Sequence, residues 1–80
     1  MKMKAREAMR DIRDKRGMTT RRIANMLNKP DRYVNDSISD CKVTNISIEK
    51  MNEILRVLEY KVVLVPCEAK IQNDWYELTN

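Results

Sequence analysis

The stretch DRYVND at 31–36 combines side chains that recognise flat hydrogen-bonding surfaces. Arg32 carries a planar guanidinium that can hold two acceptors at once, and Asn35 carries a donor and an acceptor on one amide. Asp31 and Asp36 add acceptor groups on either side. This combination favours recognition by paired hydrogen bonds.

Catalytic chemistry has little support elsewhere in the chain. The sequence has no histidine, which excludes Ser-His-Asp and Cys-His pairs and removes the commonest metal ligand. Its one glycine, Gly17, does not allow a glycine-rich phosphate-binding loop. We therefore expect a protein that is not an enzyme and that uses no cofactor and no metal.

Charge is distributed unevenly along the chain. Residues 1–35 hold 11 Lys and Arg against 4 Asp and Glu, whereas residues 36–80 hold 5 against 8. The first part is therefore the candidate surface for a polyanion. A basic surface that faces only solvent would give the same count, so charge alone does not decide the partner.

Length and composition indicate one domain, 1–80. A chain this short buries only about 60% of its unfolded surface, so the domain is marginally stable alone. No apolar run approaches the ~18 residues that span a bilayer, and the basic start MKMKAREAMR lacks the apolar region of a signal peptide. We expect a cytoplasmic protein without a membrane partner, in which Cys41 and Cys67 are free thiols.

Two helices are expected before the polar stretch. The first begins near residue 5 and runs to about residue 16, and Gly17 follows where a helix C-terminus favours a left-handed residue. Thr19 or Thr20 then offers a hydroxyl to cap a second, shorter helix. The inward residues of that helix are Ile23, Ala24 and Leu27.

A tight turn and a third helix position the polar stretch itself. The second helix must end at Asn28, because Pro30 has no amide hydrogen and disfavours helical geometry in the residue before it. The third helix spans 31–39, and its few core contacts are Val34 and Ile38. The core therefore does not need the side of this helix that carries the polar residues.

A fourth helix and a strand complete the chain. Ser47 can cap a helix whose inward residues recur at spacings of three and four. These residues are Ile48, Met51, Ile54, Leu55 and Leu58. The run YKVVLVP is apolar on both faces and β-branched, which predicts a strand that pairs with DWYELT in a β-hairpin.

The stretch GMTTRRIANMLNKPDRYVNDSI resembles the phage repressor and Cro family of helix-turn-helix DNA-binding proteins. The positions that carry the resemblance are Gly17, Met18, Thr19, Ile23, Ala24 and Val34. SIEKMNEILRVLEY is similar to the later core helix of that family, so the resemblance covers about residues 5–60. It departs from the family pattern at Asn28, where the turn usually has glycine, and at Arg22, where an acidic residue is common.

The resemblance implies a mainly α fold, a four-helix repressor-like helix-turn-helix domain with a C-terminal β-hairpin. The helical core is 1–59, and 60–80 is a β-hairpin and dimerisation extension. Similar small repressor-like proteins pair through such strands, which implies a homodimer. The residues expected at the dimer interface are Val62, Val63, Leu64, Val65 and Trp75.

The third helix is then expected to enter the major groove of double-stranded DNA. Arg32 can bind guanine O6 and N7, Asn35 can pair with adenine, and the two aspartates can accept from cytosine. The expected base contacts are therefore Asp31, Arg32, Asn35 and Asp36. The expected phosphate contacts are Arg13, Lys15, Thr20, Arg21, Tyr33 and Lys42. Tyr33 has an alternative place, partly buried beside the turn.

Two functions follow from these expectations. The first is a sequence-specific transcriptional regulator, a repressor that binds a palindromic operator as a homodimer through helix 31–39. The alternative is a phage-type or antitoxin-like protein-binding inhibitor module that reuses the fold and docks its basic face on an acidic protein.

Overall fold

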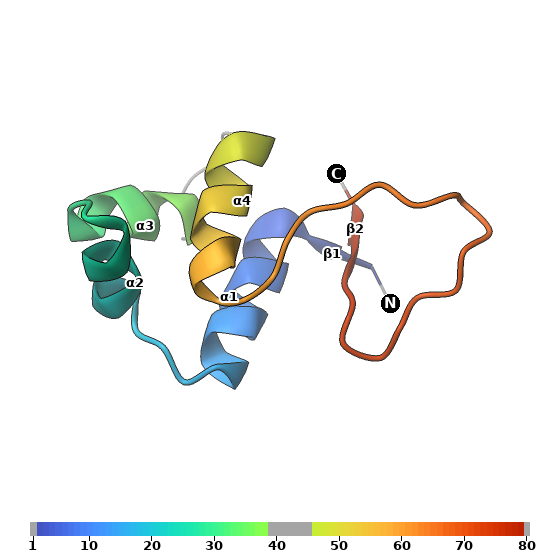
Figure 1. Cartoon of the computed structure of the whole chain (residues 1–80), viewed down its shortest axis with the longest axis horizontal. Helices are drawn as coiled ribbons and strands as arrows, with labels where there is room; N and C mark the ends of the chain where they lie inside the picture. The colour runs from blue at the N-terminus through green and yellow to red at the C-terminus, as the bar shows by residue number, and fades with distance from the viewer. Residues whose placement is uncertain (1, 39–45, 80) are drawn as a thin grey trace.

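The computed structural model describes residues 2–38 and 46–79 of the chain. Its elements are β1 (Lys2–Lys4), α1 (Ala5–Lys15), α2 (Thr20–Leu27), α3 (Asp31–Ile38), α4 (Ile48–Val57) and β2 (Glu77–Thr79). Figure 1 shows α2 and α3 at one end of the molecule, α1 and α4 in the middle, and the chain that follows α4 at the other end. The predicted mainly helical fold with four helices is confirmed. Every helix among the described residues is too short or too polar to cross a membrane.

Local sequence explains where the helices begin and end. Gly17 follows α1 with φ of 66°, and Asn28 follows α2 with φ of 57°, so both take the left-handed conformation that ends a helix. The hydroxyls of Thr19 and Ser47 each accept a hydrogen bond from the backbone amide three residues later, at 3.1 Å. These contacts confirm the predicted boundaries of α2 and the predicted start of α4.

An aliphatic core joins the four helices. Its buried members are Met9, Ile12, Ile23, Ala24, Val34, Ile38, Met51, Ile54, Leu55 and Leu58. Ala24 is fully buried, which allows α2 and α3 to pack closely. Ile48 was expected in this core but is 69% exposed, because it is the first residue of α4 and lies beyond the buried part of that helix, which begins at Met51.

The predicted β-hairpin does not form in the described residues. Positions 60–76 contain no strand, and β2 pairs in parallel with β1, with Met3 opposite Leu78. The backbone amide of Val62 donates to Asn52 Oδ1 at 3.1 Å. The start of the predicted strand is therefore hydrogen-bonded to a side chain of α4 and not to a second strand. Local turn signals had identified only the nearest partner in sequence, whereas β2 pairs with the opposite end of the chain.

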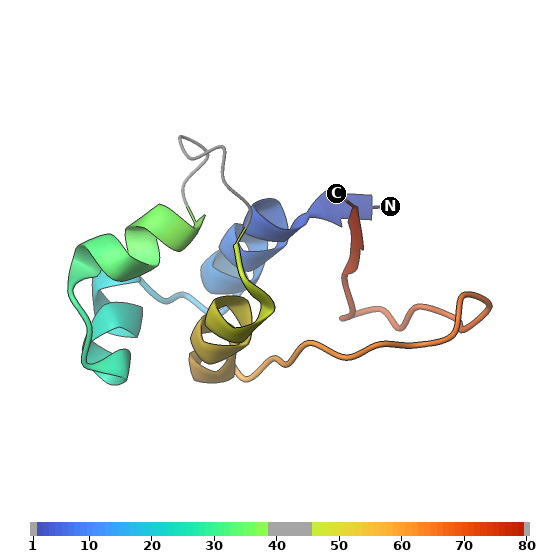
Figure 2. The ribbon, with the colours of Figure 1, turned by 90° about the horizontal axis from the view of Figure 1, so that it is seen from above.

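The C-terminal segment, residues 61–76, is an open loop held at its base. Figure 2 shows this loop extending away from the helices before β2 returns to β1. The hydroxyl of Tyr60 donates to the carbonyl of Asp74 at 2.8 Å, and that of Tyr76 donates to the carboxylate of Asp11 on α1. The two tyrosine rings meet edge to face, with centroids 6.0 Å apart. The loop is therefore attached to the helical part through a few side chains.

Candidate nucleic-acid interface

The polar side of α3 faces away from the core. Val34 and Ile38 are buried, whereas Arg32, two residues before Val34, and Asn35, one residue after it, are exposed. The hydroxyl of the buried Ser37 donates to the Tyr33 carbonyl at 2.9 Å, so the inward polar group is satisfied within the helix. The outward side chains of α3 can therefore meet a partner without any change in the core.

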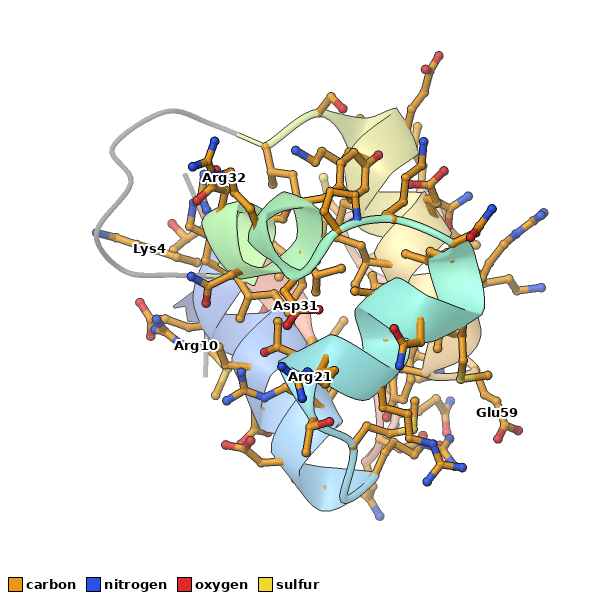
Figure 3. All side chains as sticks on the ribbon, turned by 90° about the vertical axis from the view of Figure 1, so that its left-hand side faces the viewer. Lys4, Arg10, Arg21, Asp31, Arg32 and Glu59 are labelled. Carbon is orange, nitrogen blue, oxygen red and sulfur yellow. The ribbon has the colours of Figure 1, made fainter. Side chains whose placement is uncertain are left out.

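Asp31, expected to contact a base, is paired within the chain. Its Oδ2 lies 3.3 Å from Nε of Arg21, so the pair connects α2 to the first residue of α3. Figure 3 looks onto these two helices and shows Arg21 next to Asp31. Because both side chains are exposed, the pair is worth only about 0–1 kcal/mol, and a phosphate could replace the carboxylate.

Arg13 and Thr20, two of the expected phosphate contacts, lie side by side. Nη1 of Arg13 donates to the Thr20 hydroxyl at 3.3 Å, and its Nη2 lies 3.0 Å from the carboxylate of Asp14. Thr20 is the first residue of α2, so the pair connects the end of α1 to the start of α2. The structure brings this predicted pair together beside α2.

Arg6 and Arg10, which the sequence analysis did not single out, lie on the same side of α1 as Arg13. Nη1 of Arg6 donates to the backbone carbonyl of Asp36, and Nη1 of Arg10 donates to that of Ile38 at 3.4 Å. The signal was present in the sequence, because arginines at positions i, i+4 and i+7 share one helix face.

Lys15 lies on another side of α1. It is two residues from Arg13, which corresponds to about 200° around the helix. Its Nζ is 3.3 Å from Asp11 Oδ2 and 5.3 Å from the ring centroid of Tyr76. Hydrogen bonds from Tyr76 and then Lys15 lower the pKa of Asp11. Lys15 therefore contacts the C-terminal segment, and the structure does not bring it to the side of α3 where it was expected.

Tyr33 is partly buried, as in the alternative that the sequence predicts for it. Its hydroxyl donates to Glu53 Oε1 at 2.6 Å, which joins α3 to α4 and is the main cause that raises the pKa of Tyr33. Nζ of Lys50 lies 4.3 Å from the ring centroid and Nζ of Lys29 lies 5.2 Å from it. The hydroxyl is therefore engaged inside the protein, while the two lysines place positive charge beside the turn.

The remaining predicted contact, Lys42, lies outside the described residues, as does Cys41. Cys67 is a free, exposed thiol. In the part of the chain that the structure describes, no three His, Cys, Asp or Glu side chains gather in a way that could hold a metal ion.

Comparison of the chain with protein-family models, curated proteins and solved structures gives no match. The function must therefore be inferred from the site itself.

Proposed function

We propose that this protein is a sequence-specific DNA-binding transcriptional regulator, a repressor that binds a palindromic operator as a homodimer and reads it with α3. The observation that carries the proposal is that Arg32 and Asn35 are exposed on a helix whose other side is buried. A helix with this division can enter the major groove without disturbing its own core. Arginine and asparagine are suited to paired hydrogen bonds with guanine and adenine.

In this proposal α2, the turn 28–30 and α3 act as a helix-turn-helix. Arg21, which pairs with the first residue of α3, and Arg13 and Thr20, which lie side by side at the start of α2, act on phosphates. These contacts fix the position of the helix on the duplex while the bases give specificity. Arg21 exchanges Asp31 for a phosphate when DNA binds.

Dimerisation is assigned to the C-terminal segment. Leu64 is 98% exposed, and Val63, Val65 and Trp75 are also exposed. Exposed apolar side chains that follow one another in this way are typical of a protein contact. A second copy of the chain would cover them and would add to the stability of a small domain.

The shape of the molecule restricts how the two copies can be arranged. The segment and α3 lie at opposite ends of a molecule whose longest extent is 39 Å (Figure 1). Two recognition helices must lie about 34 Å apart to enter successive major grooves. Copies joined end to end would place them too far apart, so the proposed dimer has its two chains side by side.

Fluorescence anisotropy with labelled DNA, including fragments adjacent to the gene, tests the proposal. If about six to ten phosphates are neutralised per dimer, log K should fall against log salt with a slope near −0.9 times that number. Arg32→Ala or Asn35→Ala should cost roughly 1–3 kcal/mol on the preferred site and relax the preference at one base pair. Lys70→Ala is the control, because it removes a positive charge from the C-terminal segment, at the end of the molecule opposite α3. Equal losses on specific and random DNA would show that α3 does not read bases.

The alternative function, binding of an acidic protein partner, is supported by one observation. Asp31 and Asp36 place two carboxylates on α3, and carboxylates repel phosphate. If affinity for DNA is absent at low salt while a protein partner is bound through Arg32 or Arg21, the protein-binding function replaces the regulator.

A further inference from the structure

The C-terminal end of α3 requires partners from outside the helix. α3 has eight residues, and the last four carbonyl groups of any α-helix have no partner within it. Its last turn also carries no basic side chain that could interact with the negative end of the helix dipole. Contacts from another element can therefore hold this end.

α1 supplies two such contacts. Arg6 donates to the carbonyl of Asp36 and Arg10 to the carbonyl of Ile38, both in partly buried surroundings. The two arginines are one turn apart on α1, and a charged donor makes a stronger hydrogen bond than a neutral one. α1 is itself anchored in the core through Met9 and Ile12. The arginines therefore connect the end of α3 to a helix that is fixed in the core.

We propose that Arg6 and Arg10 are positioning residues for DNA recognition, and this inference rests on the proposed function of α3. The helix is only about 12 Å long, and its buried aliphatic contacts are Val34 and Ile38. Recognition requires side chains to be held within about 0.5 Å of their productive position. By fixing the C-terminal end of α3, the two arginines fix the direction in which Arg32 and Asn35 approach the bases.

A different role for these arginines makes a different prediction. If Arg6 and Arg10 contacted phosphates, lysine would largely replace them, because it keeps the charge. If they position α3, lysine cannot replace them, because its ammonium lies one bond closer to the backbone than Nη1 and does not reach the two carbonyls in the same geometry. The distinguishing variant is therefore the double change Arg6→Lys and Arg10→Lys, with Arg22→Lys as a matched control on the exposed surface of α2.

The test compares affinities for the preferred operator and for random DNA at one salt concentration. We expect the double variant to lose about tenfold in the ratio of the two affinities, as for one weakened base contact, with the affinity for random DNA and the salt slope unchanged. Arg22→Lys should leave the ratio unchanged. An unchanged ratio in the double variant would overturn the proposal, as would equal losses on both DNAs with a smaller salt slope.

Amide hydrogen exchange without DNA gives a second measurement. In the double variant, exchange across Asp31–Ile38 should become faster relative to Thr20–Leu27, whereas Arg22→Lys should not change it. Unchanged exchange in α3 would contradict the positioning role. If the wild-type chain binds no DNA, the regulator function fails, and the exchange measurement still decides whether the two arginines hold α3.

Discussion

At one end of the molecule, α3 places Arg32 and Asn35 in solvent above the buried Val34, whereas at the other end the C-terminal segment places Val63 and Leu64 in solvent. The first surface is polar over an aliphatic core. The second is aliphatic, and it is attached to the helices through a few hydrogen bonds. The polar end is suited to hydrogen-bond recognition, and the apolar end is suited to burial against protein. In the proposed function, the two ends therefore meet different partners.

The two ends also depend on different interactions. α3 is held by the core that it shares with α1, α2 and α4. The C-terminal segment depends on side-chain hydrogen bonds made by Asn52, Tyr60 and Tyr76, on the packing of the half-buried Val62 and Tyr76 against that core, and on the three-residue strands β1 and β2. Because one hydrogen bond contributes only about 1 kcal/mol net, this segment should open locally before the helices unfold.

The largest expected effect compares one residue of the core with one of the C-terminal segment. Ile54 is fully buried on α4, so Ile54→Ala should lower the free energy of unfolding by about 2–5 kcal/mol. Leu64→Ala should change it by no more than about 0.5 kcal/mol at concentrations where the protein is monomeric. Urea denaturation followed by circular dichroism measures both. A large loss from Leu64→Ala in the monomer would contradict the contrast between the two ends.

The next effect tests dimerisation. Val63→Lys combined with Val65→Lys should give a monomer in sedimentation, with helical circular dichroism retained. Loss of the second recognition helix should weaken binding to a two-half-site operator by at least about 100-fold. Ile48→Lys is the control, because Ile48 is exposed on α4 outside the segment. A wild-type chain that stays monomeric at tens of micromolar and still binds one half-site at full strength would contradict the dimer and the palindrome.

Sequence periodicity predicted the helical half of this molecule and failed for its C-terminal part, for a physical reason. Helix signals are local: Gly17, Thr19, Asn28 and Ser47 act within a few residues of themselves, and each ends or caps the helix expected. The pairing of β1 with β2 joins positions about 75 residues apart. Nothing in the local pattern of either strand identifies the other, so the hairpin was predicted instead.

The candidate site shows the same limit at the level of side chains. The exposed positions of Arg32 and Asn35 followed from the helical spacing of Val34 and Ile38. The partners of Tyr33 and Lys15 did not follow, because each depends on an element distant in sequence, α4 for Tyr33 and the C-terminal segment for Lys15. The contact of Arg6 with α3 likewise joins residues 30 positions apart.

A smaller effect concerns the attachment of the C-terminal segment and depends on pH. The Tyr76 hydroxyl and then Lys15 lower the pKa of Asp11, so the carboxylate stabilises the fold above its ordinary pKa of about 3.9, and this contribution is lost as the pH falls below that value. Tyr76→Phe should lower stability at pH 7, and its difference from the wild type should shrink as the pH falls below about 4. Denaturation at pH 7 and pH 3 measures this change.

Tyr60→Phe is the matched control for that measurement. It removes a hydrogen bond to a backbone carbonyl, which does not titrate in this range, so its cost of about 0.5–1.5 kcal/mol should be the same at both pH values. If the Tyr76→Phe difference is equally independent of pH, the Asp11 carboxylate does not hold the segment.

The smallest expected effect returns to α3 and its ion pair. Asp31→Asn removes an exposed partner of Arg21, so it should change the free energy of unfolding by less than about 1 kcal/mol. It also removes a negative charge from the proposed DNA-facing surface and releases Arg21 for a phosphate, so affinity for both operator and random DNA should rise by about two- to fivefold at low salt. Anisotropy titrations measure the two affinities, and Glu68→Gln, the same kind of charge removal in the C-terminal segment, should leave them nearly unchanged. A loss of affinity confined to the operator and to one base pair would instead show that Asp31 reads a cytosine. In that case the ion pair with Arg21 opens on binding, and both partners contact the duplex.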